Sequence, residues 1–289
     1  MDPSGTSPLE ENPPEYIAAA RAHGIPLRQS APVKRGPLPL ELPILSYLKT
    51  KRVILASASP RRKALLAQVG LREGDHLEII PSTAPEDVDK STHGPEEYVS
   101  ATARQKALHV YQLAIEEQEK VANAKSVKGV VPEDVGLVIA ADTIIATRAG
   151  KILEKPRNEA DHVRMLKHLR DTRVHRVLTS ICVMAPKQDA SHPGYEIANH
   201  TEETKVFFAQ ADDGLPDEVI ESYVRTREGA DKAGGYAIQG VGGLVLIDRI
   251  EGNVDNVVGL PVRKCLQLCE KVCFRQGEEE VGETDEEED

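Results

Sequence analysis

The sequence contains no tryptophan, and aromatic residues make up only 3% of its 289 residues. Hydrophobic residues still account for 40% of the chain, so its core must be mostly aliphatic. The four cysteines are too few to indicate a disulfide framework, and they favour a reducing compartment such as the cytosol or the nucleus. We therefore expect a cytoplasmic protein.

Long apolar runs and an excess of positive charge are also absent. No stretch approaches the roughly 18 apolar residues of a membrane-spanning helix, and the first residues lack the apolar core of a signal peptide. The net charge is −11, but nine acidic residues lie in 277–289 without any lysine or arginine, which leaves −2 for the rest of the chain. A nearly neutral body argues against a general nucleic-acid or membrane binder.

Composition divides the chain into three parts. Residues 1–48 are rich in proline and predict an irregular or partly ordered extension. Residues 277–289 are expected to form a solvated, disordered acidic tail. Between them, residues 49–276 alternate strand-like and helical patterns and include one inserted strand pair. This pattern predicts an α/β domain with a mixed, twisted sheet flanked by helices.

Several segments of this domain carry weaker signals. Residues 119–135 resemble a surface insertion, and residues 186–200 are expected to form a long polar loop. We expect a strand over 244–250 and a loop over 252–259.

The stretch 53–62, Val-Ile-Leu-Ala-Ser-Ala-Ser-Pro-Arg-Arg, is the most informative in the chain. A short buried strand is followed by small residues and by Pro60, which is favoured at the first position of a helix. Arg61, Arg62 and Lys63 then oppose the helix dipole, an arrangement better suited to gripping an anion than to stability. The candidate phosphate-binding residues are Ser57, Ser59, Arg61 and Arg62. The alternative interpretation is an ordinary strand–helix turn with surface arginines.

A second candidate is Asp142, which follows five apolar residues at 137–141 and is itself followed by Thr143. A carboxylate at the end of such a strand lies where open α/β sheets bind ligands. It can hold Mg²⁺ or act as a base toward water. The alternative is an aspartate that caps a turn.

Three further groups complete the candidate set. Lys106, Glu86, Glu154 and Lys155 offer phosphate-neutralising cations and metal-ligating carboxylates, although each alone is equally consistent with solvated charge. The glycine-rich segment 231–240 contains Gln239, whose amide offers both a donor and an acceptor and so suits recognition of a nucleotide base. The alternative interpretation of this segment is a flexible loop. Cysteines recur at 265, 269 and 273, a spacing that favours core packing over a metal site.

Taken together, these segments resemble the Maf family of nucleoside triphosphate pyrophosphatases. The matching stretches occur in the family's order. They are 55–62 (Leu-Ala-Ser-Ala-Ser-Pro-Arg-Arg), 141–143 (Ala-Asp-Thr), 150–156 (Gly-Lys-Ile-Leu-Glu-Lys-Pro), 231–240 (Asp-Lys-Ala-Gly-Gly-Tyr-Ala-Ile-Gln-Gly), 250–253 (Ile-Glu-Gly-Asn) and 256–261 (Asn-Val-Val-Gly-Leu-Pro). Several segments in order are more specific than any one of them.

The resemblance implies a Maf/ITPase-like fold with an active-site cleft between two lobes. It also implies hydrolysis of dTTP and UTP between the α- and β-phosphates, with a divalent cation, Mg²⁺ or Mn²⁺, as cofactor. The implied base is Asp142, which is also a metal ligand together with Glu86, although Asp87 remains an alternative to Glu86. The implied phosphate-binding residues are Ser57, Arg62, Lys106 and Lys155, and the implied specificity residues are Arg61, Thr143 and Gln239.

Two other functions remain open at this point. One is a pyrophosphatase for another, modified nucleotide, and the other is a non-catalytic nucleotide-binding regulator of cell division. The resemblance weakly implies a homodimer, with a nucleoside triphosphate as the partner and neither nucleic acid nor membrane. The proline-rich extension, the 119–135 insertion, the loop at 186–200 and the acidic tail lie outside the family core.

Overall fold

The computed structural model describes residues 22–24, 40–85, 88, 93–125, 134–187 and 194–276. The chain divides into two units, Met1–Pro39 and Leu40–Asp289. In the first unit the described residues are 22–24, of which residue 22 is helical and residues 23 and 24 form a turn. The second unit contains the sheet, its helices and every residue with a candidate role.

The sheet has seven strands and is mixed, as expected. Its order is β2 (Leu77–Ile79), β1 (Arg52–Leu55), β3 (Val135–Ala146), β5 (Val174–Pro186), β6 (Tyr195–Phe208) and β7 (Ile247–Glu251), with β4 (Ile152–Leu153) paired to β3. Strand β1 is parallel to β2 and to β3, whereas the pairings of β3 with β4 and β5, of β5 with β6 and of β6 with β7 are antiparallel. Strand β3 therefore joins the parallel part of the sheet to the antiparallel part.

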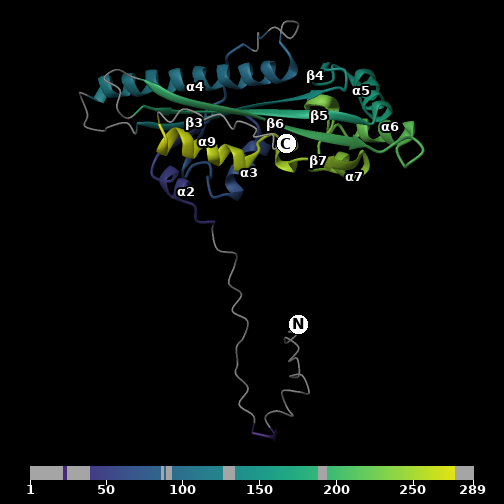
Figure 1. Ribbon diagram of the computed structural model, residues 1–289, viewed down its shortest axis with the longest axis horizontal. Helices are drawn as coiled ribbons and strands as arrows, with labels where there is room; N and C mark the ends of the chain where they lie inside the picture. Colours follow the sequence, from purple (N-terminus) through teal and green to yellow (C-terminus); the bar gives the residue numbers. More distant parts are fainter. Residues whose placement is uncertain are drawn as a thin grey trace, which may run out of the picture. The chain divides into compact units, whose positions relative to one another are not determined.

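Helices cover both faces of this sheet (Figure 1). The long helix α4 (Pro95–Lys125) lies along one face, and α2 (Pro43–Leu48), α3 (Pro60–Gln68) and α9 (Val262–Phe274) lie on the other. Helices α5 (Glu159–Thr172) and α6 (Asp217–Arg225) pack at one end of the sheet. The short helices are η1 (Ala233–Gly235), α7 (Val241–Val245) and α8 (Val254–Val258). Among the described residues, no helix combines the length and the apolar character needed to cross a membrane.

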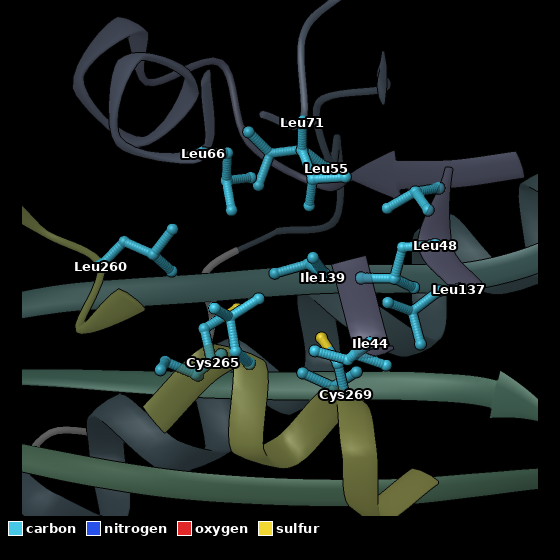
Figure 2. Close-up of a cluster of buried hydrophobic side chains, with 14 of the residues drawn as sticks. Ile44, Leu48, Leu55, Leu66, Leu71, Leu137, Ile139, Leu260, Cys265 and Cys269 are labelled. Atoms are coloured by element: carbon cyan, nitrogen blue, oxygen red, sulfur yellow. The ribbon is translucent and has the colours of Figure 1, made fainter. Parts of the chain in front are cut away.

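Successive side chains of β3 pack against helices on opposite faces of the sheet. Leu137 and Ile139 pack with α2, α3 and α9, whereas Val138 and Ala140 pack against α4. Figure 2 shows Leu137 and Ile139 among the leucines and cysteines of the first cluster. Because successive strand residues point to opposite faces, residue 142 falls on the α4 side and residue 143 on the α3 side.

The cysteines of α9 are core residues, as their spacing predicts. Cys265 and Cys269 are fully buried and Cys273 is 7% exposed, in the same cluster as Leu55 and Leu66 (Figure 2). All are free thiols, and burial raises the pKa of Cys273 to about 11. These thiols therefore serve as small apolar side chains.

A second core lies toward the other end of the sheet. Leu166 and Leu169 of α5, Phe208 of β6 and Tyr236 pack there with Ile145 of β3. Strand β3 thus contributes to both cores, and Asp142 and Thr143 lie between them along the strand.

Three expected elements are wrong at least in part. Within the expected polar loop at 186–200, Pro186 belongs to β5 and residues 195–200 belong to β6, and the two strands pair from Val174↔Phe207 to Pro186↔Tyr195. Residues 188–193 lie outside the described residues. The first half of β6 is polar because much of it is exposed or half-exposed, which hid the strand signal. The expected strand over 244–250 is confirmed only from Ile247, because residues 244 and 245 close helix α7. The expected loop at 252–259 contains α8, which is followed by Gly259 with φ +120°.

The expected insertion at 119–135 is also partly helical. Helix α4 continues to Lys125, and β3 begins at Val135. Residues 126–133 lie outside the described residues. The unit that holds the sheet begins at Leu40 and includes α2, whose Ile44, Leu45 and Leu48 are buried in the core.

Candidate active site

A cavity of about 670 Å³ opens where the strand ends, the start of α3 and the glycine-rich segment meet. Its charged lining residues among those described are Arg61, Arg62, Lys106, Asp142, Glu154, Lys155, Asp231 and Lys232. Ser57, Thr143 and Gln239 line the same cavity. The structure therefore brings together every predicted site residue that it describes, whereas Glu86 and Asp87 lie outside the described residues.

The turn from β1 into α3 has the geometry predicted for an anion cradle. Ser59 caps the helix, with its Oγ accepting a hydrogen bond from the backbone N–H of Arg62 at 3.4 Å, and Pro60 occupies the first turn. Ser57 Oγ accepts from the backbone N–H of Ser59 at 3.2 Å. Lys63 does not join the cradle, because its Nζ pairs with Glu73 at 2.7 Å. The third cation expected to grip an anion is thus engaged elsewhere.

Arg62 is held by three acceptors from different parts of the chain. Its Nη1 donates to Ser57 Oγ at 3.0 Å, its Nη2 to Thr143 Oγ1 at 2.9 Å, and its Nε to the carbonyl of Gly259 at 2.8 Å. A guanidinium tied at all three nitrogens has a fixed plane. This orientation suits bidentate recognition of phosphate.

Asp142 lies on the other side of β3 and pairs with α4. Lys106 Nζ lies 2.8 Å from Asp142 Oδ1, and the two side chains are 16% and 14% exposed. The side-chain alternation of β3 thus separates neighbouring residues, with Asp142 directed to Lys106 and Thr143 to Arg62. Both pairs face the same cavity.

The β3–β4 hairpin supplies the remaining predicted cation. Glu154 and Lys155 directly follow β4, and both are exposed side chains that line the cavity. The backbone carbonyl of Glu154 accepts a hydrogen bond from the N–H of Gly234 at 3.2 Å. This bond fixes the glycine-rich segment beside Lys155.

Buried side chains that sequence analysis missed hold the glycine-rich segment in place. Gly234 and Gly235 have φ of +71° and +77°, a region favoured by glycine. His162 Nε2 lies 2.5 Å from the carbonyl of Gly235, and His175 Nε2 lies 2.7 Å from the hydroxyl of Tyr236. Both histidines are almost fully buried, and no motif marked them, because each is a single histidine within an ordinary helix or strand.

Burial lowers the pKa of His175 to about 3, so the contact with Tyr236 involves a neutral imidazole at neutral pH.

The two adjacent arginines, Arg61 and Arg62, have different neighbours. Lys232 donates to Asp231 Oδ1 at 2.6 Å and lowers the pKa of that carboxyl, and Arg61 acts in the same direction. Arg61 thus acts on the glycine-rich segment, while Arg62 is bound to the cradle.

The lining residues fit a hard divalent cation that is shared with a substrate. Asp142 and Glu154 provide oxygen donors, and the described lining residues include no histidine or cysteine. Within the described ranges, no group of three or more His, Cys, Asp or Glu side chains gathers as a metal cage. Mg²⁺ typically binds through one or two carboxylates together with substrate phosphates, so this donor set fits it.

The fold and the cavity define an α/β protein whose cavity is lined by Arg62 and its acceptors on one side and by the Lys106–Asp142 pair on the other. The sequence model of the Maf-like protein family matches residues 52–272 of this chain. The chain therefore belongs to the Maf-like family.

Three relatives show how far the similarity extends. A dTTP/UTP pyrophosphatase of Schizosaccharomyces pombe is 42% identical over 241 residues, which are 83% of this chain and 90% of that protein. A dTTP/UTP pyrophosphatase of Anaeromyxobacter dehalogenans is 40% identical over 223 residues, 77% of this chain and 95% of that protein. A human protein, described as a probable bifunctional dTTP/UTP pyrophosphatase/methyltransferase, is 40% identical over 228 residues, 78% of this chain and 33% of that protein.

Proposed function

We propose that this chain is a nucleoside triphosphate pyrophosphatase that hydrolyses dTTP and UTP to the monophosphate and pyrophosphate. One observation carries the proposal: Asp142 and Thr143, adjacent on β3, direct Lys106 and Arg62 into one cavity from opposite faces of the sheet. The relatives named as dTTP/UTP pyrophosphatases, which match most of this chain, support the same reaction. The residues with proposed roles fall within the expected domain, 49–276.

The triphosphate binds at the cradle in this proposal. Ser57 offers a hydroxyl, Arg62 a fixed guanidinium, and Lys106 and Lys155 two ammonium groups that act as point charges. Phosphoanhydride hydrolysis needs little covalent help and much charge neutralisation. These side chains supply that neutralisation from both faces of β3.

The carboxylate of Asp142 is the proposed general base. A water molecule attacks the α-phosphorus, its proton passes to Asp142, and the bond from that phosphorus to the bridging oxygen breaks. The bridging oxygen and its electron pair leave with pyrophosphate. Lys106 holds the carboxylate in place before the reaction through the 2.8 Å contact.

A divalent cation, Mg²⁺ or Mn²⁺, would be held by Asp142 and Glu86 in this proposal, with Glu154 also within the lining. When bound, such an ion would neutralise phosphate charge and lower the pKa of a coordinated water. Removal with a chelator is expected to abolish pyrophosphate release, and adding back Mg²⁺ or Mn²⁺ is expected to restore it.

Substrate choice is proposed to lie with Arg61, Thr143 and Gln239. Arg61 and the exposed Gln239 line the cavity near the glycine-rich segment, where a base would lie. We further propose a cytoplasmic location, supported by the four free, buried cysteines. A homodimer is proposed on the family resemblance alone.

A panel assay tests the function. The purified protein is incubated with Mg²⁺ and with dTTP, UTP, the other common triphosphates and modified nucleotides, and pyrophosphate is measured. Fast release from dTTP and UTP supports the proposal, and release chiefly from another nucleotide moves it to that substrate. Tight binding without release indicates a non-catalytic binder. In water labelled with ¹⁸O, the label is expected in the monophosphate, and label in pyrophosphate would place the attack on the β-phosphorus.

A further inference from the structure

A chain of hydrogen bonds runs from the cradle into the interior of the sheet. Arg62 Nη2 donates to Thr143 Oγ1 at 2.9 Å, Thr143 Oγ1 lies 3.0 Å from Thr179 Oγ1, and Thr179 Oγ1 donates to the backbone carbonyl of Asn256 at 2.9 Å. The two threonines are direct partners across β3 and β5. Thr179 is fully buried, so the chain continues behind the wall of the cavity.

The direction of each bond follows from the number of protons. A carbonyl oxygen only accepts, so the single hydroxyl proton of Thr179 goes to Asn256. Thr179 must therefore accept from Thr143, whose own single proton is thereby committed. Thr143 in turn accepts from Arg62. The hydroxyl of Thr143 is thus oriented to receive the guanidinium, and its proton points away from the cavity.

Asn256 is the anchor of this chain. Its Nδ2 donates to the carbonyl of Val177 at 3.1 Å and to Thr204 Oγ1 at 2.9 Å. Thr204 Oγ1 also donates to the carbonyl of Asn253 and accepts from the N–H of Asn253, both at 3.0 Å. Asn256 and Thr204 are fully buried. The segment that contains α8 is therefore fastened to both β5 and β6 by side chains.

The same segment reaches Arg62 by a second route. Gly259, just beyond α8, offers its carbonyl to Arg62 Nε at 2.8 Å. Two of the three contacts that orient the guanidinium therefore lead to this segment, one through Thr143 and Thr179 to the backbone carbonyl of Asn256 and one directly to the backbone carbonyl of Gly259. Asn256 Oδ1 is buried and has no hydrogen-bond partner among the described residues. An unpaired buried oxygen is unfavourable for stability, so stability alone does not account for an asparagine here.

We infer that Thr179 and Asn256 are positioning residues that set the Arg62 guanidinium for the triphosphate. This inference rests on the proposed phosphate-binding role of Arg62. Thr143, whose proton is committed to Thr179, then influences substrate choice through Arg62 rather than by donating to the base. Neither Thr179 nor Asn256 lines the cavity among the described residues, so they act without touching the substrate.

The test compares Thr179→Val, which removes the hydroxyl at nearly constant volume, with Thr179→Ser, which keeps it. Binding is measured by calorimetry with Mg²⁺ and a dTTP analogue whose α–β bridging oxygen is replaced by methylene. Thr179→Val is expected to raise the Kd about tenfold, because it breaks the two hydrogen bonds that orient the Thr143 acceptor of Arg62, and Thr179→Ser is expected to stay within about twofold of the wild type. Thr147→Val is the matched control, because Thr147 is also a buried threonine but lies outside the cavity and takes no part in the hydrogen bonds that link Arg62 to Asn256.

A double-mutant cycle separates positioning from a general structural role. In an Arg62→Ala background, Thr179→Val is expected to have no further effect on the Kd. An equal loss in both backgrounds, or a similar loss in Thr147→Val, overturns the inference. An unchanged Kd in Arg62→Ala alone refutes the phosphate role of Arg62 instead. If thermal unfolding shows that Thr179→Val does not fold, Thr179→Ala, which also removes the hydroxyl, carries the same test.

Discussion

Lys106 and Asp142 lie 36 positions apart in the sequence, yet Lys106 Nζ approaches Asp142 Oδ1 to 2.8 Å. The contact exists because α4 crosses the face of the sheet to which Asp142 points. Both side chains are mostly buried, at 16% and 14% exposure. An ion pair in such a place holds the carboxylate at a fixed position while leaving it accessible from the cavity.

Replacement of this carboxylate is expected to reduce kcat far more than it weakens nucleotide binding. Asp142→Asn keeps the shape of the side chain but is a far weaker proton acceptor, so kcat is expected to fall by about 10²- to 10⁴-fold. Steady-state pyrophosphate release gives kcat, and calorimetry with the methylene analogue gives the Kd. Asp213→Asn, at an exposed site outside the cavity, is the control. A kcat close to that of the wild type would show that Asp142 is not the base.

Removal of the lysine is expected to act on stability as well as binding. Lys106→Met leaves the Asp142 carboxylate without this cation in a mostly buried place, which is expected to lower the free energy of unfolding by about 1–3 kcal/mol. The double variant Lys106→Met/Asp142→Asn is expected to recover part of that loss, because no unpaired charge remains. Urea unfolding of the four proteins measures the coupling. Additive losses would mean that the ion pair contributes little.

The cradle arginine is expected to resist even conservative replacement. A lysine at 62 cannot satisfy Ser57, Thr143 and the Gly259 carbonyl together, so Arg62→Lys is expected to raise the KM for dTTP by about 10- to 100-fold, roughly 1.4–2.8 kcal/mol. Lys63→Ala is the matched control on the next residue, since Lys63 pairs with Glu73 outside the cavity. Because Arg62→Lys keeps the positive charge, a KM close to that of the wild type in this variant would indicate that only the charge at position 62 matters and not its three fixed contacts.

The glycine-rich segment is expected to be sensitive at Gly234. A Cβ there would overlap the side chain of Ile145, and the φ of +71° is itself unfavourable for alanine. Gly234→Ala is expected to lower the free energy of unfolding by about 2–4 kcal/mol. Gly214→Ala isolates the backbone effect, because Gly214 has φ +85° and nothing within 4 Å of its Cβ position. It is expected to lower the free energy of unfolding by only about 1–2 kcal/mol, so similar losses would exclude the overlap with Ile145.

Acid sensitivity is expected to depend on His175. Its pKa is lowered from 6.5 to about 3 by burial, so between these values the unfolded chain binds a proton that the folded chain does not. The free energy of unfolding therefore decreases as the pH falls from about 6.5 toward 3, with a slope approaching about 1.4 kcal/mol per pH unit from this one group. Urea unfolding from pH 7 to pH 4 measures it.

His175→Gln is expected to have a shallower slope than the wild type. His168→Gln, which removes an exposed imidazole, is the matched control. If His175→Gln keeps the full slope of the wild type, His175 is not the source of the acid sensitivity.

Local signals predicted the parts of the site that are built locally. The β1–α3 turn was visible because a strand, small residues, Pro60 and two arginines follow one another within ten residues at 53–62. The Maf-like family and the mixed α/β fold predicted from the motifs are confirmed. The individual roles of the site residues stay predictions, and Glu86 lies outside the described residues.

Contacts between distant residues escaped prediction for a physical reason. Thr179 and Thr204 look like ordinary strand threonines, and Asn256 lies within an expected loop, although Thr179 and Asn256 meet across 77 positions. The loop itself was mispredicted because α8 is a single short helix with three valines among its five residues. The strand β6 was missed at its start because its exposed positions are polar. Each of these features depends on how the strands pair in the folded sheet. No single segment of the sequence determines that pairing.

The two sides of the cavity come from separate segments of the chain that meet the same strand at neighbouring positions. Thr143 contacts the 57–62 side through Arg62, and Ile145 lies against Gly234 on the 231–240 side. A change in the glycine-rich segment therefore leaves the residues proposed to break the phosphoanhydride in place. Exchange of this one loop would therefore change the proposed contribution of Gln239 to nucleotide preference, while Arg61 and Thr143 stay beside the residues proposed for hydrolysis.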